Sequence, residues 1–477
     1  MPELKLILPE LSLLALLCCV LLIDVFKRGR SNDWTSTFGL SVASLLIVLV
    51  ITATGWQAER IAVFGGMYIA DPLATSLKVF ILSAGVFALF YSRDYLARRG
   101  IVVGEYYVLA LSSVLGMMIL VSAGNLLTVY LGLELMSLSL YAMVAMQRDA
   151  SQASEAAMKY FVLGALASGM LLYGISLMYG VSGTLDIATL AHNIGGVRDG
   201  TLVVFAMVFV LCGVAFKLGV VPFHMWVPDV YQGAAAPVAL FISTAPKIAA
   251  FGMVMRILVE GLSPMRPEWS AMLAILAVLS MAIGNVTALA QTNFKRLLAY
   301  STISHMGFLL LGVIAGTNDG YAASMFYAVV YALMSLAAFG ALILICQADA
   351  ERDETADFAG FAKTSPGFAL LVMMVMFSLA GVPPFAGFWA KWFVIKEVLA
   401  AGYLWLAIVS VLFSVIGAFY YLRIVKLMYF DNPDGSVVVG AGSDMRAALS
   451  FNGLVILALG LLPTWLMTIC LVATRTF

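Results

Sequence analysis

Long apolar runs recur along nearly the whole chain, and they restrict its possible folds more than any other feature. Of the 477 residues, 63% are hydrophobic and only 11% are charged. A helix of about 20 apolar residues crosses the hydrocarbon core of a bilayer, which is about 30 Å thick. Lipid offers no partner to exposed backbone groups, so each crossing segment must hydrogen-bond internally. The sequence therefore predicts an all-α integral membrane protein.

The apolar runs divide the chain into about fourteen expected membrane spans, judged by length and composition. Most connections are short, and the longest polar ones are residues 181–200, 348–365 and 431–448. None of these connections is long enough to fold as a separate domain. The expected spans are residues 4–26, 36–55, 71–92, 105–122, 125–147, 157–180, 201–221, 234–260, 270–291, 296–316, 321–347, 366–399, 403–430 and 449–473.

Charge balance, cysteines and motifs exclude several classes of function. The 26 basic and 26 acidic residues cancel, so we expect no nucleic-acid partner and no surface for acidic substrates. No C-x-x-C, nucleotide-binding or haem motif occurs, so we expect no metal and no redox cofactor on this chain. No small-residue cleavage site follows residues 11–23, which favours a retained first helix over a signal peptide. The cysteines all fall in apolar runs and are expected to be buried thiols: Cys18, Cys19, Cys212, Cys346 and Cys470.

Basic residues are concentrated in one set of alternate loops, which predicts the orientation in the membrane. Loops rich in lysine and arginine stay on the cytoplasmic side. An even number of spans then places both termini on the outer side. The richer set is Lys27, Arg28, Arg30, Arg93, Arg98, Arg99, Arg148, Lys159, Lys295, Arg296, Arg352, Lys363, Arg423, Lys426 and Arg446. The poorer set is Lys5, Arg60, Arg198, Arg256, Arg266, Lys396 and Arg475.

Four lysines lie inside expected spans, where lysine is least favourable: Lys78, Lys217, Lys247 and Lys391. A lysine at a bilayer centre costs roughly 2.5–3.5 kcal/mol on insertion scales, so such residues usually face a wet interior and carry function. Lysine suits proton transfer because burial changes its proton affinity readily, whereas arginine stays charged. For Lys78, near a span end, an ammonium group that extends to the interface is an equal alternative.

Two spans are interrupted by similar sequences. Gly-Val-Val-Pro-Phe at 219–223 and Gly-Val-Pro-Pro-Phe at 381–385 align at an offset of 162 residues. Non-helical backbone at membrane depth survives only where protein or water satisfies it. Paired broken helices in two halves are typical of transporters built from internal repeats. The alternative is that these prolines merely kink packed helices.

The prolines in these breaks leave specific carbonyl groups without helical partners. Pro222 has no backbone N–H, so the Leu218 carbonyl loses the donor that a continuous helix would supply. Pro383 and Pro384 have the same effect on the carbonyls of Leu379 and Ala380.

One carboxylate and two histidines complete the candidate proton carriers. Glu134 stands alone in a long uncharged stretch. We expect it to pair with Lys217 and to control the proton affinity of that lysine, although a pair that only joins two helices is an alternative. His305 falls within a span and His224 lies at the end of the first break, while His192 is expected to be solvated in a polar loop. For His305, packing and proton transfer remain equal alternatives.

Three motifs carry a resemblance to a known family. They are Val-Pro-Phe-His-Met-Trp-Val-Pro-Asp-Val-Tyr-Gln-Gly-Ala at 221–234, Asn-Phe-Lys-Arg-Leu-Leu-Ala-Tyr-Ser-Thr-Ile-Ser-His-Met-Gly at 293–307 and Leu-Gly-Leu-Glu-Leu-Met-Ser-Leu-Ser-Leu-Tyr at 131–141. Over essentially its whole length, the chain resembles the antiporter-like membrane subunits of respiratory complex I. Two features favour one member of that family. No long lateral helix follows the last span, and position 391 is lysine where a paralogue carries glutamate.

The resemblance implies a role for each candidate. Glu134 and Lys217 would form a modulating pair, Lys247 would link the two halves, and Lys391 would lie on the outward route. Proton translocation would be driven by quinone reduction elsewhere in the complex, in a bacterial inner membrane. Flavin, iron–sulfur clusters and quinone would belong to other subunits, and the partners would be other membrane subunits of the complex.

The same resemblance implies fourteen helices with two inverted five-helix repeats, each with a broken helix. Residues 105–260 and 270–430 would form the repeats, after three helices in residues 1–104 and before a last helix at 449–473. Two other functions stay open. One is a subunit of a multisubunit cation/proton antiporter, and the other is a structural membrane scaffold whose lysines only lock helices together.

Overall fold

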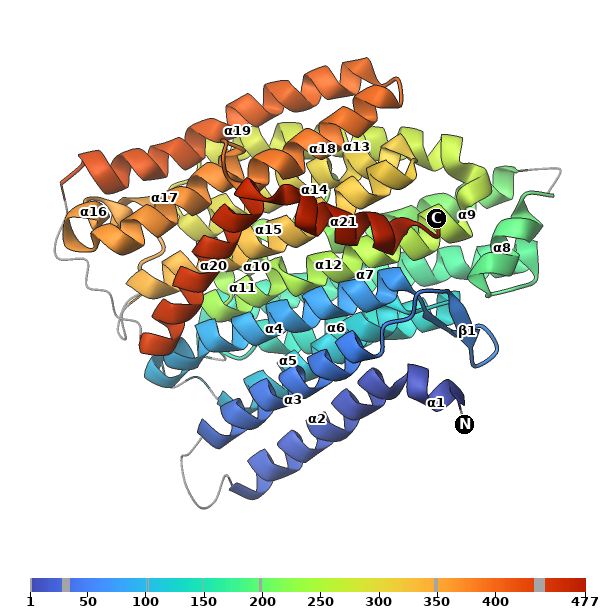
Figure 1. The fold of residues 1–477 in the computed structure, drawn as a ribbon, viewed down its shortest axis with the longest axis horizontal. Coiled ribbons are helices and arrows are strands. Elements are labelled where there is room, and N and C mark those ends of the chain that lie inside the picture. Colours follow the sequence, from blue (N-terminus) through green and yellow to red (C-terminus); the bar gives the residue numbers. More distant parts are fainter. Residues whose placement is uncertain are drawn as a thin grey trace.

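The computed structural model describes residues 2–27, 35–99, 101, 103–147, 149–196, 200–346, 351–432 and 442–477. Across these ranges the chain is almost wholly helical, with one two-stranded antiparallel sheet (Figure 1). Thirteen helices in the described part of the chain are long and apolar enough to cross a membrane. The prediction of an all-α membrane protein is confirmed.

The N-terminal region packs along one edge of the bundle, at the bottom of Figure 1. It contains α1 (Pro2–Leu6), α2 (Leu8–Lys27), α3 (Thr35–Thr54), β1 (Ile61–Val63), β2 (Tyr68–Ala70) and α4 (Pro72–Arg99). The strands pair from Ile61 with Ala70 to Val63 with Tyr68, forming a hairpin between α3 and α4.

The first half of the remaining chain is a series of long helices with two interruptions. It contains α5 (Val103–Val121), α6 (Leu126–Val144), α7 (Ser151–Ser182), α8 (Ile187–Ile194), α9 (Thr201–Leu218), α10 (Trp226–Gly233), α11 (Ala236–Ser243) and α12 (Ala245–Val254). A π-helical turn, η1 (Met255–Gly261), and a short 3₁₀ turn, η2 (Ser263–Met265), follow α12.

The second half and the C-terminal region lie beside the first half, and α15 packs against α11 and α12 (Figure 1). They contain α13 (Arg266–Leu289), α14 (Phe294–Ala315), α15 (Asn318–Ile345), η3 (Thr355–Phe358), α16 (Phe361–Thr364), α17 (Pro366–Ala380), α18 (Ala386–Ala400), α19 (Leu404–Phe430), α20 (Ser443–Leu461) and α21 (Pro463–Thr474). The expected span at 366–399 is the pair α17 and α18, and the expected last span at 449–473 falls within α20 and α21.

The two predicted breaks occur at the expected residues and have the same backbone geometry. Gly219 (φ 80°) ends α9 and Gly381 (φ 86°) ends α17 in the left-handed region, where a residue without Cβ is unstrained. The N–H of the next residue then reaches back, from Val220 to Ala215 and from Val382 to Phe377. This pattern satisfies two of the last carbonyls of each helix.

One interruption was not predicted. The expected span at 234–260 is divided at Thr244 (φ −116°, ψ −95°) into α11 and α12. Pro246 is the second residue of α12, in the first turn, where its missing N–H costs no helical bond. Every residue of α11 and α12 is buried, so this divided helix lies in the core of the bundle.

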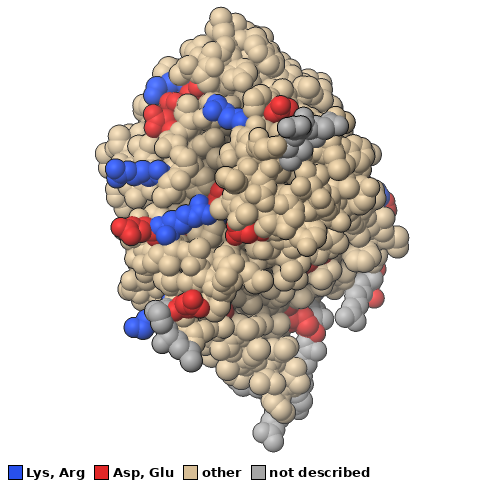
Figure 2. Space-filling view, turned by 90° about the vertical axis from the view of Figure 1, so that its right-hand side faces the viewer, with Lys and Arg blue, Asp and Glu red and all other residues tan. Residues whose placement is uncertain are grey.

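Both termini lie at the same end of the bundle, together with α8, while α16 lies at the opposite end (Figure 1). Figure 2 views the end that carries the termini, where a few acidic and basic side chains lie among uncharged surface. Four basic residues used for the orientation lie outside the described residues: Arg28, Arg30, Arg148 and Arg198. Two others, Lys295 and Arg256, are buried and not exposed in loops.

Candidate functional site

Lys217 lies near the end of α9, buried against α6. Its Nζ donates a hydrogen bond to Ser137 Oγ over 2.7 Å and lies 3.4 Å from Tyr141 OH. The ring of Tyr141 also lies below the ammonium group, 5.6 Å from Nζ to the ring centroid. Lys217 is therefore held by neutral oxygens and by an aromatic face.

Glu134 lies one turn before Ser137 on α6. Its Oε1 accepts a short hydrogen bond from Ser168 of α7. No ion pair joins Glu134 to Lys217 among the described residues, which corrects the direct contact expected from the sequence. Ser137 and Tyr141 provide the nearest polar contacts of the ammonium group, so Glu134 acts on it only across this neutral hydroxyl layer.

Lys247 lies in the first turn of α12 and contacts the broken end of α9. Its Nζ donates to the Leu218 carbonyl over 3.0 Å and lies 3.4 Å from the Lys217 carbonyl. The indole ring of Trp226 lies on its other side, 5.1 Å from Nζ. The carbonyl that Pro222 deprives of a helical donor is thus satisfied by a lysine from the next broken helix.

Lys391 has the corresponding position in the second half. Its Nζ donates to the Ala380 carbonyl over 2.8 Å and to Ser414 Oγ of α19 over 3.0 Å. The Phe308 ring lies 5.2 Å away. Leu218 and Ala380 are separated by the same 162 residues as the two break motifs. Lys247 and Lys391 are therefore equivalent in space, although α12 supplies one and α18 the other.

His305 lies in α14 at the centre of a hydroxyl network. Its Nδ1 lies 2.6 Å from Tyr327 OH, and its Nε2 lies 3.0 Å from Tyr421 OH. Tyr421 in turn makes a short hydrogen bond with Ser301. Phe308, which contacts Lys391, follows His305 by one helical turn. His305 is therefore a buried ring near Lys391, and both of its nitrogens are hydrogen-bonded.

A polar stripe on α15 connects the two halves. Ser335 Oγ donates to Ser243 Oγ at the end of α11 over 2.8 Å, and Tyr331 OH donates to Thr302 Oγ1 over 2.7 Å. Together with Tyr327, these residues recur every four positions, so they share one helix face. These residues were not among the predicted site residues, although polar side chains at i, i+4 and i+8 in an apolar helix provide a signal.

His224 lies apart from this network. It is half-buried in the first break, and its Nδ1 has no hydrogen-bond partner among the described residues. The structure therefore does not bring His224 together with the lysines. Instead Trp226, two residues later, extends from the break to the Phe216 carbonyl over 3.0 Å and to Lys247.

Lys78 differs from the other three lysines because it is paired with a carboxylate. Its Nζ lies 2.5 Å from Glu10 Oε1 and 2.8 Å from Tyr68 OH. Only 4% of Lys78 is exposed, so it does not extend to the interface. By contrast, none of Lys217, Lys247 and Lys391 makes an ion pair within the described ranges.

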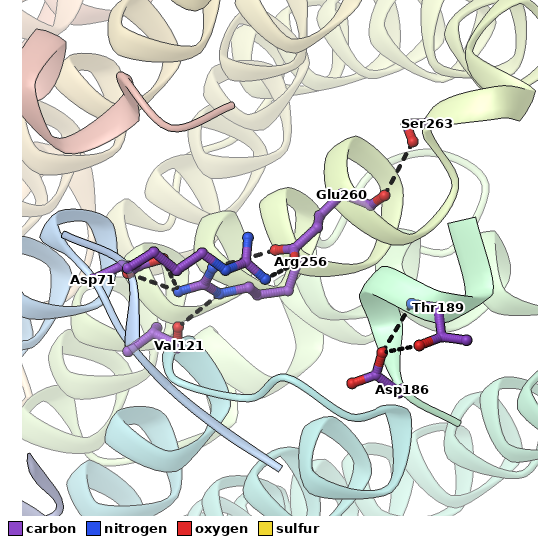
Figure 3. Close-up of polar contacts among 8 residues, drawn as sticks. Asp71, Val121, Asp186, Thr189, Arg256, Glu260 and Ser263 are labelled. Atoms are coloured by element: carbon purple, nitrogen blue, oxygen red, sulfur yellow. Dashed lines mark hydrogen bonds and ion pairs between the residues drawn. The ribbon is translucent and has the colours of Figure 1, made fainter. Parts of the chain in front are cut away.

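Arg256 lies in a second buried ion cluster, in the π-helical turn after α12 (Figure 3). It contacts Asp71 at 2.8 Å, Glu260 at 3.3 Å and the Val121 carbonyl at 3.1 Å. Arg60 reaches the same glutamate from the loop before β1. Arg256 was counted among the basic residues of the loops, but it is fully buried and gives no information on loop charge.

Lys295 forms a third cluster, at the end of the bundle away from the termini. Its Nζ contacts Glu351 at 2.9 Å, Asp353 at 3.4 Å and the Ala234 carbonyl at 3.2 Å. Burial alone would raise the pKa of Glu351, but Lys295 and a hydrogen bond from Tyr95 outweigh burial and hold it below the usual value. This carboxylate is therefore charged at neutral pH.

No cluster of three or more histidine, cysteine, aspartate or glutamate side chains that could hold a metal ion occurs in the described part of the chain. The polar site consists of lysine, tyrosine, serine, threonine and histidine side chains, together with the carboxylate of Glu134. Such groups can accept, donate and pass protons.

Comparison with known proteins gives one consistent assignment. A family described as "NADH:quinone oxidoreductase/Mrp antiporter, TM" matches residues 123–417, which include all three lysines of the site. NADH-quinone oxidoreductase subunit N of Thiobacillus denitrificans is 53% identical over 473 residues, covering 98% of this chain and 97% of the relative.

Solved structures agree. A chain of respiratory complex I from Thermus thermophilus, determined with bound aureothin, matches with a TM-score of 0.82 and 31% identity. The match covers 96% of this chain and 98% of the Thermus thermophilus chain. A chain of the Mrp complex from Dietzia sp. DQ12-45-1b shares the fold, with a TM-score of 0.84, 24% identity and coverage of 99% and 97%. The chain therefore belongs to the family of NADH-quinone oxidoreductase subunit N, the multi-pass, antiporter-like membrane subunits of respiratory complex I.

Proposed function

We propose that this chain translocates protons through Glu134, Lys217, Lys247, His305 and Lys391, driven by quinone reduction on other subunits. The observation that carries the proposal is the surroundings of the three lysines. Each is buried and held by neutral oxygens, whereas Lys78 and Arg256 are neutralised by carboxylates. A buried charge that only joins helices is normally paired, because an unpaired one is costly. A lysine without a fixed counter-charge can give up its proton and remain hydrogen-bonded.

The cap geometry gives each proton transfer a structural consequence. A cation beside the last carbonyls of a helix is favoured by the helix dipole, by about 0.3–1 kcal/mol and up to about 2 kcal/mol when partly buried. Protonated Lys247 therefore stabilises the broken end of α9, and protonated Lys391 stabilises that of α17. Loss of the proton weakens that stabilisation, so the breaks are the two-state elements through which a distant event can act.

Glu134 controls the protonation of Lys217. Its charge favours the protonated form of Lys217, and it acts across Ser137 and Tyr141 in the conformation described above. A conformation in which the two side chains meet would favour that form more strongly. Alternation between this conformation, in which Glu134 and Lys217 are separated, and one in which they meet is the first step of the proposed mechanism.

Transfer between the halves uses the α15 stripe. A proton that leaves Lys247 passes near Ser243 and Ser335, then along Tyr331, Tyr327 and His305 toward Lys391. Water molecules complete the links wherever side chains are too far apart to hydrogen-bond directly. His224, at the edge of the first break, is assigned to proton uptake from the cytoplasmic side.

The proposal includes the arrangement in the bilayer. Residues 105–260 and 270–430 form two inverted repeats, with residues 1–104 and 449–473 outside them, and both termini lie on the periplasmic side of a bacterial inner membrane. Support comes from the 162-residue offset shared by the breaks and their capped carbonyls. Flavin, iron–sulfur clusters and quinone are assigned to the partner subunits.

The test is proton pumping by the assembled complex in liposomes. Lys247→Ala is expected to abolish most NADH-driven acidification while the complex still assembles. Lys396→Ala, at a lysine with 60% of its side chain exposed, is the matched control and should pump normally. Normal pumping by assembled Lys247→Ala complex would support the scaffold alternative.

A further inference from the structure

Two cavities meet at the end of the bundle that carries the termini. The first is an apolar groove of about 580 Å³ between α4, α15, α20 and α21. The second, of about 500 Å³, opens beside the loop before β1 and the end of α21. Trp56 and Val472 line both cavities, so the apolar groove continues into the second cavity.

The second cavity forms the mouth of the groove, and the two differ sharply in chemistry. Hydrocarbon side chains line the groove almost completely, including Phe80, Phe87, Leu333, Leu459 and Ile469. The mouth contains two arginines, Arg60 and Arg475, and one carboxylate, Glu59. One end of the continuous site therefore suits an anion beside a cation, while the rest suits hydrocarbon.

The arginines of the mouth are arranged differently. Arg60 is fixed by an ion pair with Glu260, the residue that also binds Arg256 (Figure 3). Arg475 lies exposed just after α21. Trp56, 41% exposed, lies where the two cavities meet, and tryptophan favours the level of lipid headgroups. An exposed tryptophan beside arginines is typical of a site at the membrane interface.

The length of the groove matches one leaflet. Along α4 the lining residues run from Pro72 in the mouth through Ser76 to Phe87. At 1.5 Å per residue, Ser76 to Phe87 spans roughly 16 Å. Half of a hydrocarbon core is about 15 Å. An acyl chain with its head at the mouth would thus fill the groove to the bilayer centre.

One polar atom lies where the ester groups of such a lipid would be. The hydroxyl of Ser76 is buried and has no hydrogen-bond partner within the described residues. It lines the groove one turn from Pro72, at the polar end. Buried hydroxyls normally have a partner, so a ligand carbonyl at this level would satisfy it.

We propose that this groove and mouth bind one membrane glycerophospholipid. Its phosphate lies between Arg60 and Arg475, an ester carbonyl accepts from Ser76, and an acyl chain lies along α4. Ile248 forms part of the groove wall and directly follows Lys247. The acyl chain therefore seals the core helix α12 against water from the side. The site stands independently of the proposed proton route.

The experiment uses the whole complex in nanodiscs that contain phosphatidylethanolamine with a diazirine on one acyl chain. After irradiation, labelled peptides are identified by mass spectrometry. The segment 76–87 and the segment 465–472 should be labelled in preference to the exposed surface of α13 around Ile275, which is 61% exposed. Arg475→Gln should lower this labelling by about fivefold, the effect of one lost arginine–phosphate contact. Lys396→Gln should leave it unchanged.

Two further labelling experiments distinguish a phospholipid from other occupants of the groove. A diacylglycerol with the same diazirine chain lacks the phosphate and should label the groove no better than it labels α13. Thr468→Trp, which fills the groove from its exposed rim, should suppress labelling by the phospholipid. Equal labelling of the groove and α13, insensitivity to Arg475→Gln, or cross-links from the groove to a peptide of a neighbouring subunit would each overturn the proposal.

Discussion

The Nζ atom of Lys391 lies 2.8 Å from the carbonyl oxygen of Ala380, the last residue of α17. Lys247 makes the same contact with Leu218 at the end of α9. The carbonyls that the prolines leave without helical donors are thus capped by the lysines assigned to proton transfer. In the proposed mechanism the Nζ atom that caps each helix is also the atom that carries the proton, so a change in lysine protonation would act directly on a broken helix.

Removal of Lys217 tests the first step of the proposed mechanism. Lys217→Ala is expected to lower proton pumping and coupled quinone reduction by about tenfold or more, as removal of a proton-transfer group does. Lys217→Arg should fail as well, because arginine keeps its proton. Pumping in proteoliposomes, with assembly verified by subunit composition, measures both. Near-normal pumping in assembled Lys217→Ala complex would contradict the assignment.

Substitution of Glu134 separates control from carriage. Glu134→Gln removes the charge but leaves every lysine, so pumping should fall less than in Lys217→Ala. Glu134→Asp, with the charge on a shorter arm, should give an intermediate rate. The same pumping assay ranks the three variants. If Glu134→Gln left pumping unchanged while Lys217→Ala nearly abolished it, Glu134 would serve only to hold α6 against α7 through Ser168.

The glycines at the breaks provide a test of backbone geometry. A Cβ on Gly219 would lie 2.7 Å from Val227 Cγ2, and one on Gly381 would lie 2.8 Å from Lys391 Cδ. Because both glycines also have positive φ, alanine should destabilise each break by about 1 kcal/mol or more. Thermal inactivation and pumping should both be impaired. Gly180→Ala, where nothing lies within 4 Å of the added methyl, is the matched control.

The α15 stripe tests the connection between the halves. Tyr331→Phe removes one hydroxyl and its 2.7 Å bond to Thr302, and Ser335→Ala removes the bond to Ser243. Each loss should cost about 0.5–1.5 kcal/mol of stability. If the stripe carries protons, the double variant should pump far less than this small cost explains. Unchanged pumping in the double variant would assign the stripe to packing alone.

The sequence predicted those features that depend on local chemistry. Proline and glycine marked the breaks at 219–223 and 381–385, because both residues act on the backbone where they stand. The division at Thr244 was missed, because Pro246 was interpreted within a continuous apolar run. Long-range pairs were also beyond sequence reasoning: Lys78 meets Glu10, and Arg256 meets Asp71, through packing that no spacing reveals. Glu134 and Lys217 were expected in contact, but Ser137 binds the ammonium group.

Lys391→Met and Lys391→His compare loss of the titratable group with its partial replacement. Methionine keeps the stem length but cannot cap Ala380 or carry a proton, so pumping should fall substantially in assembled complex. Histidine can still exchange protons near neutral pH and should retain part of the activity. Full pumping by Lys391→Met would exclude both roles of the lysine.

The most direct measurement is proton pumping by Lys391→Arg complex, because this substitution separates capping from proton transfer. Arginine can still donate to the Ala380 carbonyl, but it does not release its proton. Lys396→Arg, five residues later on α18 and largely exposed, is the control. We expect the Lys391→Arg complex to assemble and to be stable but to lose nearly all of its pumping, while the control pumps normally. Full pumping by assembled Lys391→Arg would show that Lys391 serves only as a helix cap.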